Sequence, residues 1–280
     1  HRSGQRATAS MDGILDRVRS VPADQIMLAL DWGDRSELEM LRHYFQMFPL
    51  PVRLIPDHSM REVLKYGEGV SSLLIDLQRE PLSRFEQMMK RWLDILLASI
   101  SLLVLSPLML LTAAIIRLET GGPVIFRQRR MGFNNQLFVI YKFRTMRVAE
   151  DGPLVTQARQ NDPRVTPFGR LLRRASIDEL PQLFNVLKGD MSIVGPRPHA
   201  IAHDDEYGRM IAEYAFRRHV KPGITGWAQV NGFRGGTARL EQMSKRVELD
   251  LWYINNWSLA LDLQIIARTA LELARARNAY

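Results

Sequence analysis

The stretch "KRWLDILLASISLLVLSPLMLLTAAIIRLE", residues 90–119, decides the fold because it is too apolar for an ordinary surface helix. Between Trp92 and Ile116 it carries a single charge, Asp94. A helix of this length measures roughly 35 Å, which is enough to cross the hydrocarbon core of a bilayer. A helix buried in a globular domain is the alternative, but so long a run with one charge disfavours it. We therefore predict a membrane helix over 86–120.

A serine–proline pair interrupts the centre of this helix. Pro107 lacks the N–H that a helix requires and its ring clashes with the preceding turn, so the pair predicts a kink. Ser106 can offer a hydrogen bond to the freed carbonyl group. A spanning helix is expected to have one strongly basic end, whereas here Lys90 and Arg91 flank one end and Arg117 the other. The pattern favours a re-entrant helix that returns to the face it entered, with a simple kinked span still open.

The chain before this helix alternates between strand-like and helical segments. Short apolar runs at 25–30, 51–57 and 71–78 have the length of strands, and 34–48 has helical spacing of its apolar residues. The pattern is typical of an α/β unit, but it is too short for a complete doubly wound domain. We therefore predict a partial α/β accessory domain over 11–85. Residues 1–10 are polar and are expected to form a flexible tail or a cloning remnant.

The chain after the helix begins with two segments of alternating apolar residues, "PVIFRQRRMG" and "NQLFVIYKFRTMR", which predict a β-hairpin. A polar loop and a short basic helix over 168–175 follow. Further helices are expected over 246–277. Their aromatic residues Trp252, Tyr253 and Trp257 suit either a water–lipid boundary or core packing.

Composition limits the kinds of partner. The 280 residues suffice for one large domain or two modest ones, and the absence of cysteine excludes disulfides and cysteine-based zinc sites. A net charge of +8 favours anionic partners, although basic proteins also gain solubility from charge. Neither an RNA-binding motif interleaved with aromatic residues nor helix-turn-helix spacing occurs, so we expect no nucleic acid.

The stretch "ASIDELPQLFNVLKGDMSIVGPRP", residues 175–198, contains two adjacent carboxylates. Ser176 and Glu179 have the spacing of a capping box, which would make both acids ordinary helix-start residues. A helix N-terminus among arginines is also an anion site, and aspartate is an established nucleophile toward phosphoryl groups. Asp178 and Glu179 could also hold Mg²⁺ together with substrate phosphates. The local sequence leaves the structural and catalytic interpretations open.

Cationic side chains are dense around this stretch, in "FRQRR" (126–130), "YKFRTMR" (141–147), "RLLRR" (170–174) and "GPRPH" (195–199). Guanidinium groups match phosphate oxygens bidentately. In the last motif, Pro196 and Pro198 stiffen the backbone on both sides of Arg197, so the turn presents that side chain rigidly. The glycine-rich segment 219–237 suits either plain turns or a loop that covers a substrate.

These motifs, in this order and behind a Ser-Pro-broken apolar helix, resemble the bacterial sugar transferase family, the monotopic polyprenyl-phosphate phosphoglycosyl transferases. The resemblance covers roughly residues 86–280 and extends to "DPRVTPFGRLLRRASIDELPQLFNVLKGDMSIVGPRP" and "HVKPGITGWAQVNG". The segment before it is similar to the accessory domain of the larger, glucose-type members. Those members carry transmembrane helices further upstream, so the chain resembles such an enzyme shortened at its N-terminus.

The resemblance implies transfer of a sugar 1-phosphate, expected to be glucose 1-phosphate, from a UDP-sugar to polyprenyl phosphate with release of UMP. It implies that Asp178 is the nucleophile of a covalent intermediate, that Glu179 assists, and that both carboxylates hold Mg²⁺. Ser106 and Pro107 match the family's helix-breaking motif. The residues expected to bind substrate or phosphate are Lys142, Arg144, Arg173, Pro196, Arg197 and Pro198.

Together these patterns predict a mixed α/β protein: an α+β catalytic domain over 121–280, the re-entrant helix, interfacial amphipathic helices and the partial accessory domain. Expected partners are a UDP-sugar, polyprenyl phosphate, inner-membrane phospholipids and, as an open point, further copies of the chain. The expected location is the bacterial inner membrane with the catalytic domain on the cytosolic face. The first membrane step of exopolysaccharide assembly is the expected role. A non-catalytic membrane scaffold that binds nucleotide sugars or anionic lipid is the alternative.

Overall fold

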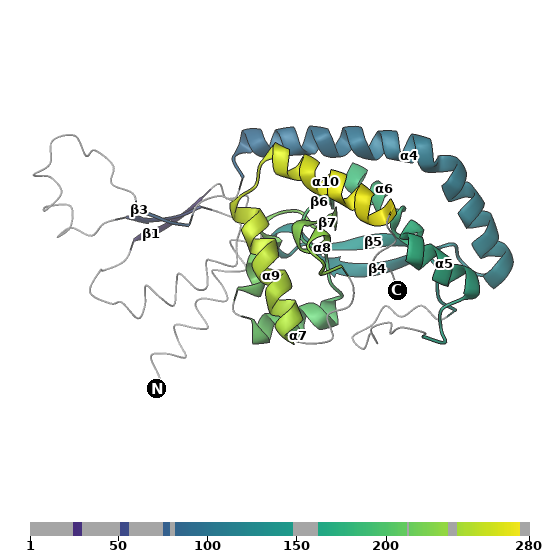
Figure 1. Cartoon of the computed structure of the whole chain (residues 1–280). Coiled ribbons are helices and arrows are strands. Elements are labelled where there is room, and N and C mark those ends of the chain that lie inside the picture. The colour runs from purple at the N-terminus through teal and green to yellow at the C-terminus, as the bar shows by residue number, and fades with distance from the viewer. Residues whose placement is uncertain are drawn as a thin grey trace, which may run out of the picture. The chain divides into compact units, whose positions relative to one another are not determined.

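The computed structural model of the chain describes residues 25–29, 51–55, 75–78, 82–147, 162–211, 213–234 and 240–274 (Figure 1). The chain divides into two compact units, His1–Glu80 and Pro81–Tyr280. The helix predicted over 34–48 and the tail over 1–10 lie outside the described residues.

The described part of the first unit is a three-stranded sheet of β1 (Ile26–Ala29), β2 (Val52–Ile55) and β3 (Ile75–Gln78), in that order. All three predicted strands are confirmed. β1 and β2 are parallel, whereas β3 runs antiparallel to β2, so the sheet is mixed. Val52 and Leu54 are buried and alternate with half-buried neighbours, which is the period of two expected of a strand.

The second unit combines α-helices, 3-10 turns (η) and short strands. Its elements in chain order are α4 (Arg84–Thr120), β4 (Ile125–Met131), η1 (Phe133–Asn135), β5 (Leu137–Phe143), α5 (Pro167–Ala175), η2 (Ile177–Glu179), α6 (Gln182–Lys188), β6 (Ser192–Val194), α7 (Ile201–Met210), η3 (Tyr214–His219), β7 (Gly223–Thr225), α8 (Trp227–Val230), α9 (Leu240–Asn255) and α10 (Leu259–Ala274).

The predicted hairpin is confirmed as β4 and β5, which pair antiparallel in unbroken register from Ile125 opposite Phe143 to Met131 opposite Leu137. The turn between them places Asn134 and Asn135 at positive φ, a conformation that asparagine tolerates better than most residues. β6 and β7 form a separate parallel pair. The short basic helix predicted over 168–175 is also confirmed, as α5.

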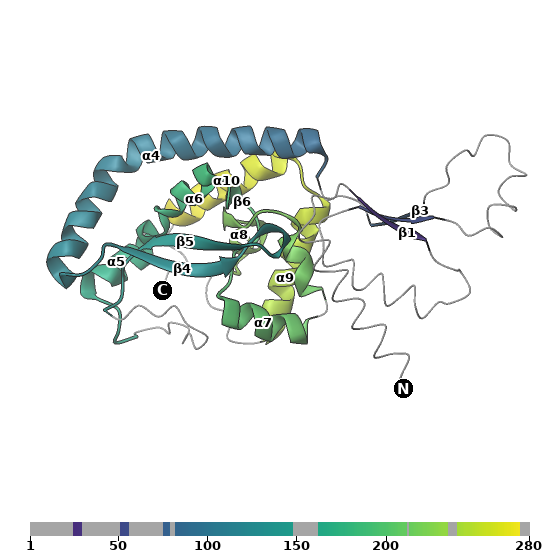
Figure 2. The ribbon, with the colours of Figure 1, turned by 180° about the vertical axis from the view of Figure 1, so that it is seen from behind.

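Helix α4 has defined ends and a bend at its serine–proline pair. Ser83 caps its N-terminus in a complete capping box with Glu86, and Gly121 ends it in the left-handed conformation. Pro107 deprives the Leu103 carbonyl of its helical donor, and the Ser106 hydroxyl donates to that same oxygen over 2.9 Å. Figures 1 and 2 both show the helix as a bent rod. The predicted kink is therefore confirmed.

Both arms of α4 pack on the same globular unit (Figure 2). In the first arm, Ala98 is buried against α6 and β5 residues, among them Val186 and Ile140. In the second arm, Ile116 is buried against Phe143 and Leu172. The helix therefore contacts the same unit before and after the bend.

Polar anchors fix the first arm. Lys90 forms a buried ion pair with Asp262 of α10 at 2.5 Å. Asp94, the one charge inside the apolar run, accepts hydrogen bonds from the Ser192 hydroxyl and the Ile193 N–H of β6 at 2.9 and 2.8 Å. Arg91 donates to two carbonyl oxygens at the end of α6. The charged side chains near the start of α4 therefore bond to other elements of the same unit.

The opposite face of α4 is apolar and uncovered. Leu103, Leu110 and Leu118 are 77%, 72% and 85% exposed. Among the described residues, α4 is the one helix long and apolar enough to cross a membrane, and little of its most apolar window is buried. Large exposed apolar surface of this kind marks an interaction site.

The three aromatic residues whose role was left open divide between the two alternatives. Tyr253 is buried in the core with Val194 and Ile265, and its hydroxyl donates to Asp262. Trp257 donates to the same carboxylate from a half-buried position. Trp252 is 44% exposed and stacks on Trp227.

The Lys90–Asp262 pair yields a test of this packing. Lys90→Met should lower the free energy of unfolding of the full chain by about 3–5 kcal/mol, because it leaves a buried carboxylate without its cation. Lys245→Met, which removes an exposed pair with Glu248, should cost less than about 1 kcal/mol. Thermal melts in detergent measure both, and equal melting temperatures for the two variants would contradict a structural role for the buried pair.

Candidate active site

The acid pair lies on a short turn between two helices. α5 ends at Ala175, and Ser176 adopts the left-handed conformation with φ of 57°, where its N–H still donates to Arg173. The chain then makes the 3-10 turn η2, which carries Asp178 and Glu179, before Pro181 begins α6. The two carboxylates are thus held on a tight turn, outside any α-helix.

The predicted capping box at Ser176 is wrong. An N-cap residue needs an extended backbone, whereas Ser176 is the left-handed C-cap of α5 and its side chain makes no capping bond. Its hydroxyl instead accepts a hydrogen bond from Arg234 at 2.6 Å. Glu179 is drawn away by cations from other elements. Consequently no long helix begins at the acid pair, and a helix N-terminus does not supply the anion site there.

Helix α6 places η2 opposite strand β5. The buried Asn185 side chain accepts from the Tyr141 N–H at 3.0 Å and donates to the Val139 carbonyl at 2.7 Å, so it extends the edge of the strand as a backbone would. Lys142 follows Tyr141 in β5 and reaches Glu179. The asparagine therefore fixes the separation between the strand cation and the acid pair.

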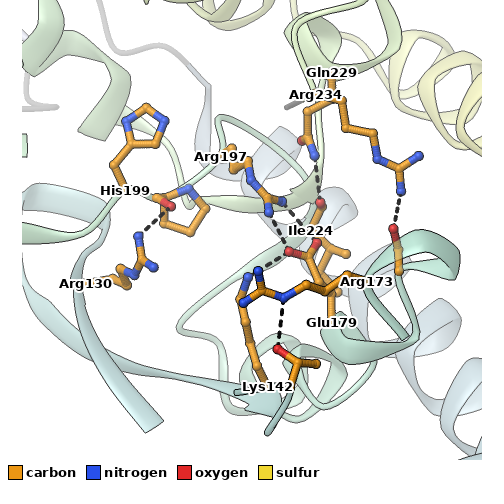
Figure 3. A network of polar contacts seen from close by, with 12 residues as sticks. Arg130, Lys142, Arg173, Glu179, Arg197, His199, Ile224, Gln229 and Arg234 are labelled. Carbon is orange, nitrogen blue, oxygen red and sulfur yellow. Dashed lines mark hydrogen bonds and ion pairs between the residues drawn. The ribbon is translucent and has the colours of Figure 1, made fainter. Parts of the chain in front are cut away.

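The Gly-Pro-Arg-Pro turn follows β6 and is held by β7. The Gly195 N–H donates to Thr225 at 2.8 Å, and the Gly223 N–H donates to the Pro196 carbonyl at 3.0 Å. A Cβ at Gly195 would lie 2.4 Å from the Lys221 carbonyl oxygen, so only glycine permits this approach. Arg197 then points toward the acid pair (Figure 3).

Glu179 is the centre of an ion-pair network. Lys142 donates to it at 2.7 Å, and the Arg197 guanidinium forms a bidentate pair at 2.5 and 3.0 Å (Figure 3). Burial alone raises the pKa of this carboxyl, but the charges and hydrogen bonds of Arg197 and Lys142 outweigh it and hold the pKa well below its usual range. Glu179 is therefore a permanent anion that joins η2, β5 and the arginine turn.

Asp178 has a different environment. No described residue donates a hydrogen bond to its carboxylate. Burial and the negative charge of Glu179 raise the pKa of Asp178 to about 6, and the charges of Lys142, Arg173 and Arg197 limit the rise. A half-buried carboxylate that is ionised at neutral pH, close to three cations and not engaged by them, is a suitable nucleophile toward an anion.

A buried layer supports the arginine turn from behind. Arg217 forms an ion pair with Asp250 of α9 at 2.8 Å and donates to the Arg197 carbonyl at 2.8 Å. His199, next in the same turn, contacts Tyr214 and Arg217. Burial and the surrounding arginines lower the pKa of His199 well below its usual range, so its ring is neutral. This layer holds Arg197 in place from α9 and η3.

The predicted site residues fall into two groups. Lys142, Arg173 and Arg197 gather around the acid pair, and Arg173 is fixed by the Thr145 hydroxyl at 2.9 Å. Arg144 instead donates to the carbonyls of Met146 and Arg147, and no described contact joins it to the acids. Pro196 and Pro198 act through their backbones, as acceptors for the Gly223 N–H and the Arg130 side chain.

Three further residues belong to the site and were not singled out from the sequence. Arg130 donates to the carbonyl behind Arg197, Arg234 to Ser176, and Gln229 to Ile224 (Figure 3). For Arg130 the signal was present: it shares a strand face with the buried Gln128, while Arg127 and Arg129 are exposed. For the other two, only the packing of the glycine-rich segment reveals their position.

Within the described residues, the acid pair offers two carboxylate ligands to a magnesium ion. Among the described residues, no group of three or more acidic, histidine or cysteine side chains could hold a metal. Glu179 is engaged by two cations, whereas the Asp178 carboxylate accepts no hydrogen bond from them. Mg²⁺ is commonly held by one or two carboxylates with substrate phosphates completing its shell, and this pair fits that arrangement.

The site consists of an ionised carboxylate among three cations, and it lies in a unit that bears an uncovered apolar helix. This combination is typical of sites that bind phosphorylated groups at a membrane surface. The chain belongs to the bacterial sugar transferase family, whose model matches residues 85–276.

Three curated relatives are described as UDP-glucose:undecaprenyl-phosphate glucose-1-phosphate transferases. The relative from Xanthomonas campestris pv. campestris is 43% identical over all of this chain and 59% of its own length. The Escherichia coli (strain K12) relative is 43% identical over 97% of this chain and 59% of its own length. The Caulobacter vibrioides relative is 52% identical over 76% of this chain and 80% of its own. The chain thus spans about three-fifths of the length of the first two.

Neutralising Asp178 and neutralising Glu179 should have opposite effects on the stability of the protein. The pKa of Asp178 is about 6 in the folded protein against 3.8 ordinarily, so stability is lost as the pH rises from about 4 to 6. Asp178→Asn should therefore raise the free energy of unfolding above pH 6, by at most about 3 kcal/mol, and have no effect below pH 4. Glu179→Gln should lower it at pH 7, since two cations lose their partner. Melts across pH measure both, and a destabilised Asp178→Asn at pH 7 would contradict this electrostatic account.

Proposed function

We propose that this protein transfers glucose 1-phosphate from UDP-glucose to undecaprenyl phosphate and releases UMP. One observation carries the proposal: Asp178 is ionised, half-buried and unbonded beside three cations, while its neighbour Glu179 is fully engaged. The names of the relatives supply the substrates, since all three act on UDP-glucose and undecaprenyl phosphate.

The reaction proceeds by two displacements at one phosphorus atom. A carboxylate oxygen of Asp178 attacks the β-phosphorus of UDP-glucose, the bond from that phosphorus to the bridging oxygen breaks, and UMP leaves with the electron pair. A phosphate oxygen of undecaprenyl phosphate then attacks the aspartyl-bound phosphorus. The acyl-phosphate bond breaks, Asp178 regains its carboxylate, and the lipid diphosphosugar is released. Splitting one displacement into two is the advantage of a covalent nucleophile.

The chain's own residues orient the phosphates. Lys142, Arg173 and Arg197 supply positive charge around the attacked phosphorus, where charge is already high in the diphosphate. Glu179 holds two of these cations at fixed distances and keeps them from pairing with Asp178. Mg²⁺, held by Asp178, Glu179 and substrate phosphates when bound, would neutralise part of the diphosphate charge.

We further propose that α4 is re-entrant in the bacterial inner membrane, with the catalytic unit on the cytosolic face. Both arms pack on one globular unit, and the residues near both ends bond to it: Lys90 to Asp262, and Glu119 to the Phe168 N–H. A helix tied to one soluble unit at both ends is suited to a dip rather than a crossing. We propose the first membrane step of exopolysaccharide assembly as the role of this transfer.

The first displacement can be measured alone. Incubation of the purified chain with UDP-glucose, without acceptor lipid, should release UMP in a burst matching the enzyme concentration, because Asp178 retains the phosphosugar. Asp178→Asn should lower the rate of the UMP burst at least about 1000-fold. Glu248→Gln, an exposed control on α9, should leave this rate unchanged. The burst rate should rise with pH through about 6, since the ionised carboxylate attacks. An Asp178→Asn variant that releases UMP normally would favour another nucleophile, whereas a native chain that releases no UMP would favour the non-catalytic scaffold.

Single cysteines can locate the ends of α4, since the native chain has no cysteine. Met88→Cys and Leu118→Cys lie near opposite ends, and Gln264→Cys reports the side of the globular unit. In sealed vesicles, a membrane-impermeant maleimide should label all three from the same side, because a dipping helix returns to its face of entry. Labelling of Met88→Cys and Leu118→Cys from opposite sides would establish a spanning helix.

A further inference from the structure

A pocket of about 140 Å³ opens beside the acid pair. Ser176 and Glu179 border it on the η2 side, α8 contributes Gln229, and α10 contributes Thr269 and Glu272. Leu180, Leu183, Ile224 and Val230 add apolar surface. The pocket therefore combines a few polar groups with an apolar lining, which is the usual composition of a small-molecule site.

Gln229 lines this pocket and carries a buried acceptor that no described residue uses. Its amide nitrogen donates to the Ile224 carbonyl at 3.3 Å, which assigns the nitrogen to that side and leaves Oε1 on the other (Figure 3). Oε1 is buried and receives no hydrogen bond from any described residue. A buried acceptor without a donor is unfavourable by about 1–3 kcal/mol, so such a group requires an explanation.

The neighbouring polar groups are held in place by the protein. The hydroxyls of Thr225 and Thr269 bond to each other at 2.7 Å and join β7 to α10. Arg234 is fixed by the Ser176 hydroxyl. Glu272, half-buried on α10, provides a second acceptor. A ligand here meets the polar side chains of Gln229, Glu272 and Arg234, with apolar side chains between them.

We infer that this pocket holds the sugar ring of the nucleotide sugar, with the side-chain amide of Gln229 hydrogen-bonded to a sugar hydroxyl. The inference rests on the proposed function. Glu179 borders the pocket and directly follows the proposed nucleophile, so the occupant is the group nearest the attacked phosphorus. The sugar is joined to that phosphorus through one oxygen atom, whereas uridine is a further phosphate away. Hydroxyl donors and an apolar ring face match these acceptors and side chains.

Binding measurements separate the sugar from the nucleotide. In an Asp178→Asn background, which prevents turnover, Gln229→Ala should weaken UDP-glucose binding about tenfold, the value of one hydrogen bond to a buried group. The same change should leave the affinity for UDP unaltered, because UDP has no sugar. Gln264→Ala, at an exposed glutamine of α10, is the control and should alter neither affinity. Equal weakening of UDP and UDP-glucose, or no weakening of either, would overturn the inference.

A second measurement changes the ligand before it changes Gln229. UDP-glucose analogues that each lack one hydroxyl are titrated into the Asp178→Asn protein. One analogue should bind about tenfold more weakly, and Gln229→Ala should add no further loss for that analogue, since both changes remove the same hydrogen bond. If every analogue binds as tightly as UDP-glucose, the pocket does not hold the sugar.

The outcomes also separate this inference from the proposed function. A chain that binds UDP-glucose through Gln229 but releases no UMP retains the pocket and loses the proposed reaction. A chain that releases UMP, with binding of UDP-glucose unaffected by Gln229→Ala, retains the reaction and loses the pocket.

Discussion

The site depends on the ion pairs of Glu179. Two adjacent carboxylates on one tight turn repel each other, so the surrounding cations determine which is ionised more readily. Lys142 from β5 and Arg197 from the β6 turn both bond to Glu179, which joins three elements through one charge. Asp178 shares their field without sharing their hydrogen bonds, and its pKa rises to about 6. One acid is thereby fixed by ion pairs, and within the described residues the neighbouring carboxylate is not.

The membrane helix and the site share a scaffold. Asp262, the partner of Lys90, lies on the same helix, α10, as Thr269 and Glu272, which border the pocket beside Glu179. Asp94 bonds to β6, the strand that leads directly into the arginine turn. Charges that interrupt an otherwise apolar helix are thus used to orient the two elements nearest the chemistry. The position of α4 and the position of the site are therefore set by the same contacts.

Local patterns predicted what local forces determine. The hairpin, α5, the strands of the first unit and the Ser106 bond to Leu103 all follow from periodicity or from one missing N–H. The capping box did not form because Ser-x-x-Glu indicates only one local possibility. Glu179 instead bonds to Lys142 and Arg197, which lie 37 and 18 residues away in the chain. Arg130 and Gln229 were missed because strand register and the packing of α8 decide which polar side chain is buried. The glycine-rich segment contains β7 and α8. Its own residues did not predict the strand, because β6, the strand that pairs with β7, lies outside the segment.

In the proposed reaction, a covalent intermediate explains how one cluster of cations can serve two phosphorylated substrates. On this proposal the nucleotide sugar arrives from water and the acceptor from the bilayer, and both bring phosphate to Lys142, Arg173 and Arg197. If Asp178 retains the phosphosugar, UMP departs before the lipid phosphate enters, so the cations never hold both substrates together. The sugar keeps its bond to phosphorus through both displacements. The inferred pocket bordered by Glu179 is therefore needed in each half of the proposed reaction, whereas a uridine site is needed only in the first.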